Sequence, residues 1–114
     1  AGDDVLREVA RRLQSVTRDG ETPARIGGDE FVVVLDPIID LDGARAAARR
    51  IRDVLVDPPI VLLDGVRFGA SIGVAVSRPD EDADQLQSRA DRALYRAKAR
   101  RASAIEVSPD PPAP

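Results

Sequence analysis

The residues best suited to chemistry form one short segment, Arg-Ile-Gly-Gly-Asp-Glu-Phe, at positions 25–31. Gly27 and Gly28 lack a Cβ and can let a phosphate approach the backbone closely. Asp29 and Glu30 are adjacent carboxylates, and such a pair can hold one or two divalent cations, which neutralise a triphosphate and lower the pKa of an attacking hydroxyl. A Gly-Gly turn with two solvated acids is the alternative interpretation of these four residues.

The composition narrows the possible chemistry. The 114 residues include no Cys and no His, which excludes disulfides, Cys/His metal sites and any thiolate or imidazole base. The formal net charge is -3, with 17 basic and 20 acidic residues spread along the chain, so nucleic acid is not an expected partner. The longest apolar runs are too short to span a bilayer, and we expect a soluble single domain whose catalysis would use carboxylates and bound ions.

The first elements that must position the segment are a helix and a hairpin. Apolar residues at helical spacing from Asp3 predict an amphipathic helix capped by Asp3 or Asp4, with Arg7, Glu8, Arg11 and Arg12 on its outer face. Residues 15–23 indicate a loop, 24–26 a short strand and 31–35 an apolar strand, so the two glycines and two acids form a hairpin tip. A second amphipathic helix follows a cap at Asp40 or Asp42.

The second half of the chain again predicts a hairpin followed by a helix. Residues 60–63 and 66–76 flank Asp64-Gly65, which predicts a second hairpin, and residues 82–101 form a third helix. Residues 104–107 suggest a short strand, and the Pro-rich residues 109–114 a disordered tail. This order predicts an α+β fold with a mostly antiparallel sheet and helices packed on it. Phe31 and Phe68 should seal the hairpins against the helices, and Tyr95 should lie in the core.

Four motifs in order resemble the GGDEF family. Positions 27–31 carry the five-residue signature for which the family is named, after the arginine that usually accompanies it. Positions 2–7 (Gly-Asp-Asp-Val-Leu-Arg), 70–75 (Ala-Ser-Ile-Gly-Val-Ala) and 90–98 (Ala-Asp-Arg-Ala-Leu-Tyr-Arg-Ala-Lys) look like three further family motifs. The resemblance covers about residues 2–103. It implies a palm-like nucleotidyl-cyclase fold, truncated at its N-terminus because family members begin with a further strand and helix.

The resemblance implies a diguanylate cyclase, which condenses two GTP into cyclic di-GMP with Mg²⁺ or Mn²⁺ in a homodimer. It implies catalytic and metal-binding roles for Asp29 and Glu30. The substrate-binding residues that it implies are Asp3 for guanine and Gly27, Gly28, Lys98 and Arg101 for the phosphates.

Some of these roles have structural alternatives. Asp3 is also an N-cap, and Lys98 is also a cation that the dipole favours near a helix end. The family often has an arginine where this chain has Ala102, and Arg101 would substitute only if the helix end shifts. An inhibitory product site often follows the pattern Arg-x-x-Asp, which here corresponds to Arg18 and Glu21, and a solvated loop is the other interpretation.

The resemblance also sets expectations for the parent protein. Family cyclases carry another metal-binding Asp and a substrate-binding Asn before the first motif, so we expect residues 1–108 to be a partial GGDEF domain that is inactive alone and exposes a sheet edge or an apolar groove. The parent should be cytoplasmic with an upstream sensory domain, and both a membrane-attached and an unattached parent are compatible with the sequence. Two other hypotheses remain: a degenerate domain that binds GTP or cyclic di-GMP without catalysis, and an interaction module without nucleotide chemistry.

Overall fold

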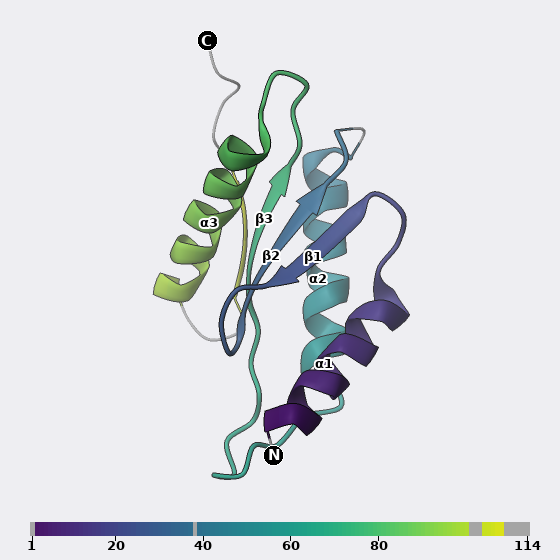
Figure 1. The fold of residues 1–114 in the computed structure, drawn as a ribbon, viewed down its shortest axis with the longest axis vertical. Coiled ribbons are helices and arrows are strands. Elements are labelled where there is room, and N and C mark those ends of the chain that lie inside the picture. Colours follow the sequence, from purple (N-terminus) through teal and green to yellow (C-terminus); the bar gives the residue numbers. More distant parts are fainter. Residues whose placement is uncertain (1, 38, 101–103, 109–114) are drawn as a thin grey trace.

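A computed structural model describes residues 2–37, 39–100 and 104–108, with side chains from Asp4 onward. The elements, in chain order, are α1 (Gly2–Val16), β1 (Glu21–Arg25), β2 (Glu30–Leu35), α2 (Leu41–Val56), β3 (Ser71–Val76), α3 (Ala83–Arg100) and β4 (Ile105–Val107). The strands form one sheet in the order β1-β2-β3-β4. Helix α3 covers one face, α2 covers the other, and α1 packs on α2 (Figure 1). The predicted α+β class is confirmed.

The sheet is mixed rather than mostly antiparallel. Only β1 and β2 are antiparallel, whereas β2 pairs with β3, and β3 with β4, in parallel. The prediction was wrong in this detail because each of the last two connections contains a helix, and such a crossover returns the chain in the same direction. Residues 60–63, expected as a sheet strand, lie outside the sheet.

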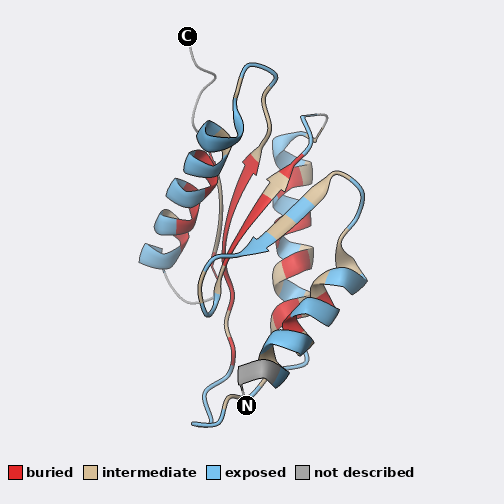
Figure 2. Cartoon of the chain, viewed as in Figure 1, coloured by how far each residue is buried: buried red, intermediate tan, exposed pale blue. Residues whose placement is uncertain are grey.

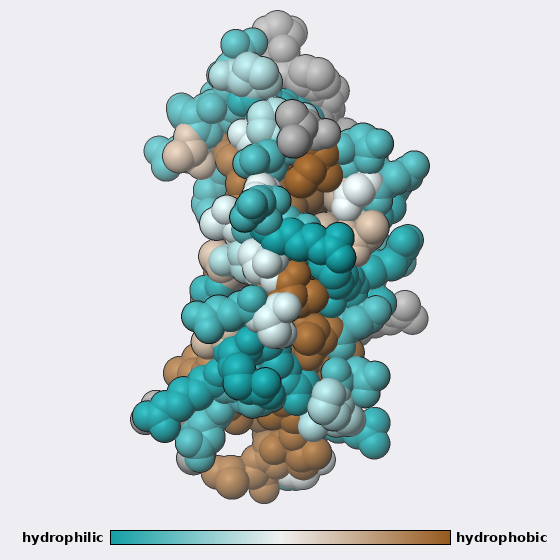
Figure 3. Space-filling model, turned by 90° about the vertical axis from the view of Figure 1, so that its right-hand side faces the viewer, coloured by the Kyte–Doolittle hydropathy of each residue, from teal (hydrophilic) through white to brown (hydrophobic). Residues whose placement is uncertain are grey.

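Residues 57–70 form an arm that projects from one end of the molecule. Its Asp64-Gly65 turn forms as predicted, with a φ of 82° at Gly65 and a hydrogen bond of 2.8 Å from Leu62 N to the carbonyl oxygen of Val66. Pairing in the arm is limited to one isolated bridge between Val61 and Arg67, so β3 begins at Ser71 rather than at residue 66. Figure 3 shows hydrophobic side chains at this end, where Val61, Leu63 and Val66 are exposed.

The core has two layers, one on each side of the sheet (Figure 2). Phe31 and Phe68 are buried on the α2 side, as predicted, with ring centroids 6.3 Å apart in an edge-to-face contact. Tyr95 is 77% exposed, so its expected place in the core was wrong. The sheet-facing residues of α3 include Leu94, and the next residue in a helix points about 100° away from it.

The helix caps predicted from the sequence are confirmed for α2 but not for α1. The Asp40 side chain caps α2 by accepting a hydrogen bond of 2.7 Å from Gly43 N, and Asp42 lies in the first turn. Helix α1 begins at Gly2, so Asp3 and Asp4 lie in its first turn instead of preceding it. Carboxylates in a first turn still favour the helix through its dipole.

Arg12 was expected on the outer face of α1, but it is buried. Its guanidinium donates to the carbonyl oxygens of Val54, Leu55 and Pro58 at 3.1, 3.3 and 2.6 Å. The last carbonyls of a helix lack partners within it and attract cations. Arg12 therefore joins α1, the end of α2 and the start of the arm.

The contact between α3 and the sheet is closest at Gly73. A Cβ at this position would lie 2.2 Å from the Leu94 backbone nitrogen and 2.4 Å from the Ala90 carbonyl oxygen. These atoms belong to the helix backbone, which cannot move aside as a side chain can. Any side chain at position 73 would therefore push α3 away from β3.

We expect Gly73→Ala to lower the free energy of unfolding by about 3 kcal/mol or more, because overpacking here displaces a whole helix. Gly28→Ala is the matched control, since no atom lies within 4 Å of its added Cβ, and it should change stability by no more than about 0.5 kcal/mol. Urea denaturation followed by circular dichroism measures both. Equal effects of the two substitutions would contradict this account of the contact.

Arg89 anchors the N-terminal half of α3. Its buried guanidinium donates to Glu81 at 2.5 and 2.6 Å and to the carbonyl oxygen of Val76 at 2.6 Å. The Arg89 hydrogen bonds hold the pKa of Glu81 below its ordinary value, although burial acts in the opposite direction. Arg89 thereby ties the N-terminal half of α3 to the end of β3 and to the loop residue Glu81.

This pKa shift predicts how stability depends on pH. A lowered folded-state pKa stabilises the protein at pH values above the ordinary 4.5, and the contribution is lost as the pH falls toward the folded-state pKa. The stability difference between the wild type and Glu81→Gln should therefore be largest near neutral pH and shrink below pH 4.5. Urea titrations at several pH values test this, and a difference that stayed constant would show that the Glu81 charge is not involved.

Candidate active site at the β1–β2 hairpin

The hairpin between β1 and β2 carries the glycines and the acids at its tip. The backbone nitrogens of Ile26 and Gly27 both donate to the Glu30 carbonyl oxygen, at 2.7 and 3.3 Å. The Arg25 guanidinium donates to the Gly28 carbonyl oxygen at 2.9 and 3.1 Å. Arg25 therefore closes the tip from one side, which gives the arginine before the glycines a structural role.

Neither glycine of the tip is required for a left-handed backbone, since the positive φ angles in the described chain lie at Gly20 and Gly65. A Cβ at Gly27 would lie 2.8 Å from Glu30 Oε2, so this glycine makes room for the Glu30 carboxylate. A Cβ at Gly28 would meet open space. The surface beside Gly28 is thus free for an atom of a ligand.

The two carboxylates differ in their surroundings. Asp29 is exposed, and its carbonyl oxygen accepts a hydrogen bond of 2.8 Å from Ser71 N, which fixes the tip to β3. The Glu30 side chain is 28% exposed, and its Oε1 lies 3.2 Å from Lys98 Nζ. Lys98 is half exposed in the last turn of α3. The fold therefore brings the signature and the lysine together from distant parts of the sequence.

The chemistry of the two carboxylates fits a magnesium ion. Mg²⁺ typically binds one or two protein carboxylates together with substrate phosphates and water. Asp29 and Glu30 supply such oxygen donors, and the space beside Gly28 adjoins them. Within residues 2–37, 39–100 and 104–108, no group of three or more His, Cys, Asp or Glu side chains forms a complete metal cage.

The remaining site residues predicted from the sequence are not found at this tip. Glu21 is at the opposite end of β1, where its side chain is only 6% exposed and forms a bidentate ion pair with Arg50 of α2. Its Oε1 also accepts a hydrogen bond of 2.9 Å from Arg18 N. The Asp3 side chain and Arg101 lie outside the described part of the structure.

Sequence reasoning missed Arg50 at this end of β1. It is one of several arginines in α2. It differs from the exposed ones because it is half-buried, next to the buried alanines of the helix. Its partner Glu21 is 29 residues away in the chain, so no local spacing could reveal the pair.

The family model described as "Diguanylate cyclase, GGDEF domain" matches residues 1–104. The chain belongs to the GGDEF domain family. It is 41% identical over 101 residues to diguanylate cyclase A of Treponema denticola, covering 86% of this chain and 27% of that protein. It is 46% identical over 98 residues to diguanylate cyclase DgcM of Escherichia coli K12, covering 85% and 23% of the two chains. The chain thus spans about a quarter of the length of these relatives.

A solved structure of a GGDEF protein supports the fold. This EAL/GGDEF domain protein from M. capsulatus is 34% identical, with a TM-score of 0.70 over 95% of this chain and 70% of that chain. The chain is also 39% identical over 108 residues to response regulator PleD of Caulobacter vibrioides. This match includes 91% of the present chain and 24% of PleD. In the part of the GGDEF chain described here, no helix is long and apolar enough to cross a membrane.

The position of Glu30 depends on the space at Gly27, which predicts the effect of Gly27→Ala. The added Cβ should move the Glu30 carboxylate away from Lys98, with a stability change of at most about 1 kcal/mol because the displaced atom ends a flexible side chain. NMR shifts of the Glu30 carboxyl carbon and Lys98 Cε measure this displacement. Gly28→Ala should leave both shifts unchanged, and unchanged shifts in Gly27→Ala would contradict the prediction.

Proposed function

We propose that the protein to which these residues belong is a diguanylate cyclase. It would condense two GTP into cyclic di-GMP and release two pyrophosphates. The observation that carries this proposal is the meeting of Glu30 with Lys98 at 3.2 Å, beside the exposed Asp29 and the open space at Gly28. Metal-binding oxygens, a phosphate-binding cation and room for a phosphate group are the parts that phosphoryl transfer requires. Relatives named diguanylate cyclase share this stretch of chain.

Each residue has a definite task in this proposal. Asp29 and Glu30 hold Mg²⁺ or Mn²⁺, which when bound neutralises phosphate charge and lowers the pKa of the attacking hydroxyl. Lys98 provides a compact positive charge for the phosphates, and its pairing with Glu30 keeps it beside the tip before a nucleotide arrives. Asp3 accepts hydrogen bonds from guanine, and Arg101 adds a second cation for the phosphates.

The reaction needs two copies of the domain. Each subunit of a two-fold dimer binds one GTP. The 3′-hydroxyl of each nucleotide releases its proton to solvent, and its oxygen forms a bond to the α-phosphorus held by the partner. The bond between the α-phosphorus and the bridging oxygen breaks, and pyrophosphate leaves with that oxygen. Residues 1–114 alone should not turn over, because the described residues contain no group of three or more Asp or Glu side chains that could hold a metal ion.

The second candidate is a degenerate GGDEF domain that binds GTP or cyclic di-GMP without catalysis. Ala102 replaces the arginine that the family often carries near Lys98, which favours this alternative. At the possible product site, the Glu21 carboxylate is already bound by Arg50 and by Arg18 N. These contacts support a structural role for Glu21 over product binding.

Incubation of the parent protein with GTP and Mg²⁺ tests the proposal, with cyclic di-GMP and pyrophosphate measured by chromatography. Asp29→Asn should lower kcat/KM by about 100-fold or more, because it weakens metal binding at the transferred phosphate. Lys98→Met should lower it by about 10-fold or more through lost phosphate binding. Its fold should remain intact, since a half-exposed ion pair contributes at most about 1 kcal/mol.

Arg100→Met is the matched control, because Arg100 also lies in the last turn of α3 and pairs with a partly exposed carboxylate, that of Glu106, at 2.7 Å. It should retain full activity. GTP binding without any cyclic product would establish the degenerate domain instead. Absence of both binding and product would leave only an interaction role.

A further inference from the structure

In the described part of the chain, strand β4 forms an edge of the sheet. In the described residues it pairs only with β3, through bonds that include Ile72 N to the Ala104 carbonyl oxygen at 2.9 Å and Ser108 N to the Val74 carbonyl oxygen at 2.7 Å. Alternate residues of a strand bond to the same neighbour. Ala104 and Ser108 therefore face β3, whereas Ile105 and Val107 direct their N–H and C=O groups away from the sheet. Such free groups can pair with another strand.

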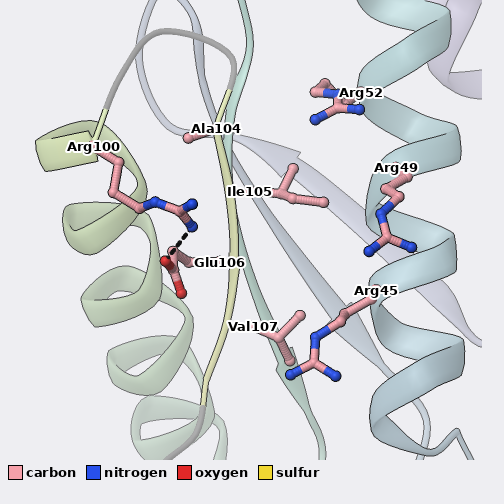
Figure 4. Close-up of a pocket in the computed structure, with 8 residues that line it drawn as sticks. All are labelled: Arg45, Arg49, Arg52, Arg100, Ala104, Ile105, Glu106 and Val107. Carbon is pink, nitrogen blue, oxygen red and sulfur yellow. Dashed lines mark hydrogen bonds and ion pairs between the residues drawn. The ribbon is translucent and has the colours of Figure 1, made fainter.

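A groove of about 410 Å³ lies between this edge and α2. Figure 4 shows the side chains of Ile105 and Val107 pointing from β4 toward α2, and those of Arg45 and Arg49 pointing from α2 toward β4. The groove thus has an apolar side and a cationic side. The residues that line it are Arg45, Arg49, Arg52, Arg100, Ala104, Ile105, Glu106 and Val107.

Two arginines of α2 that line the groove, Arg45 and Arg49, are available to an anionic partner. Arg49 makes no ion pair or hydrogen bond with the residues that the structure describes. Arg45 approaches Asp42 at only 3.8 Å, and the Asp42 side chain is 97% exposed. Exposed pairs of this kind are weak and easily exchanged. Four arginines against one carboxylate, that of Glu106, give the groove an excess of positive charge.

The spacing of the arginines matches that of a strand. Arg45 and Arg49 are four residues apart, which is a rise of about 6 Å along a helix. Side chains on one face of a strand repeat every two residues, or about 6.7 Å. Arg45 lies next to Val107, and Arg49 lies farther along the groove toward Ile105 (Figure 4). Two same-face side chains of a strand beside β4 would therefore meet these two guanidiniums.

We propose that this groove binds an extended acidic segment of a partner protein as a fifth strand on β4, with Asp or Glu at alternate positions. Backbone hydrogen bonds to Ile105 and Val107 provide affinity, and the acidic side chains select the segment through Arg45 and Arg49. A small anion would use the guanidiniums but leave the apolar side and the strand edge unused. The groove lies at the opposite edge of the sheet from β1 and is separate from the signature hairpin.

Amide NMR and hydrogen exchange on the 114-residue chain test the proposal. The probe is the peptide acetyl-Thr-Glu-Thr-Glu-Thr-Glu-Thr-amide. Exchange of the Ile105 and Val107 N–H groups should slow by about tenfold or more on binding, because they become hydrogen-bonded. The N–H of Glu106, which faces β3, should change little. Binding should weaken as salt is raised.

Three controls separate the contributions. Arg49→Glu should weaken binding by about tenfold or more, whereas Arg7→Glu, a reversal at an exposed site on α1, should have no effect. A peptide with Gln in place of Glu should not bind, because it lacks the negative charges that pair with the arginines. A peptide N-methylated at the residues that face β4 should not bind either, because its backbone N–H groups can no longer donate hydrogen bonds to β4.

Two kinds of result would contradict the proposal. Binding that survives N-methylation without amide protection would assign the groove to small anions and overturn strand addition. No binding of the parent peptide, or equal binding by the Arg49→Glu variant, would overturn the proposed site.

Discussion

The close contact between Gly73 and the backbone of α3 is the constraint on which the rest of the structure depends. The helix can lie against β3 only because position 73 has no side chain, since a Cβ there would lie 2.2 Å from the Leu94 nitrogen. Arg89 then fixes the start of the helix, and Lys98 emerges at its far end beside Glu30. The distance between the Glu30 carboxylate and the Lys98 ammonium group therefore depends on a glycine that touches neither.

Arginine does much of the structural work in this chain. All but one of its 17 basic residues are arginines, and there is no Cys, His or Trp. Arg12 binds three carbonyl oxygens at the end of α2, and Arg89 binds both Glu81 and β3. A planar guanidinium with five donors can satisfy several buried acceptors at once, which lysine cannot. The lone lysine stands where a compact charge is useful, at the proposed phosphate site.

Specific residues show how far the sequence alone could predict the fold. The helix positions, the Asp40 cap and the burial of Phe31 and Phe68 followed from periodicity and turn chemistry, which act over a few residues. The parallel pairing of β2 with β3 did not follow, because strand direction depends on how the chain crosses the sheet. Arg12 and Tyr95 were misplaced for a related reason: hydrophobic patterns do not show that helix-end carbonyls need a donor or that an aromatic ring faces solvent.

The sequence by itself determined the family and its chemical groups, because Gly27, Gly28, Asp29 and Glu30 are contiguous and their order is a local property. Only the tertiary structure decided which residues those groups meet. It placed Lys98 against Glu30, gave Gly27 the task of accommodating that carboxylate, and committed Glu21 to Arg50. Among the residues that the structure describes, it also left one edge of β4 unpaired, beside the arginines of α2 that line the groove. These contacts join residues far apart in the chain, so they depend on how helices and strands pack rather than on local spacing.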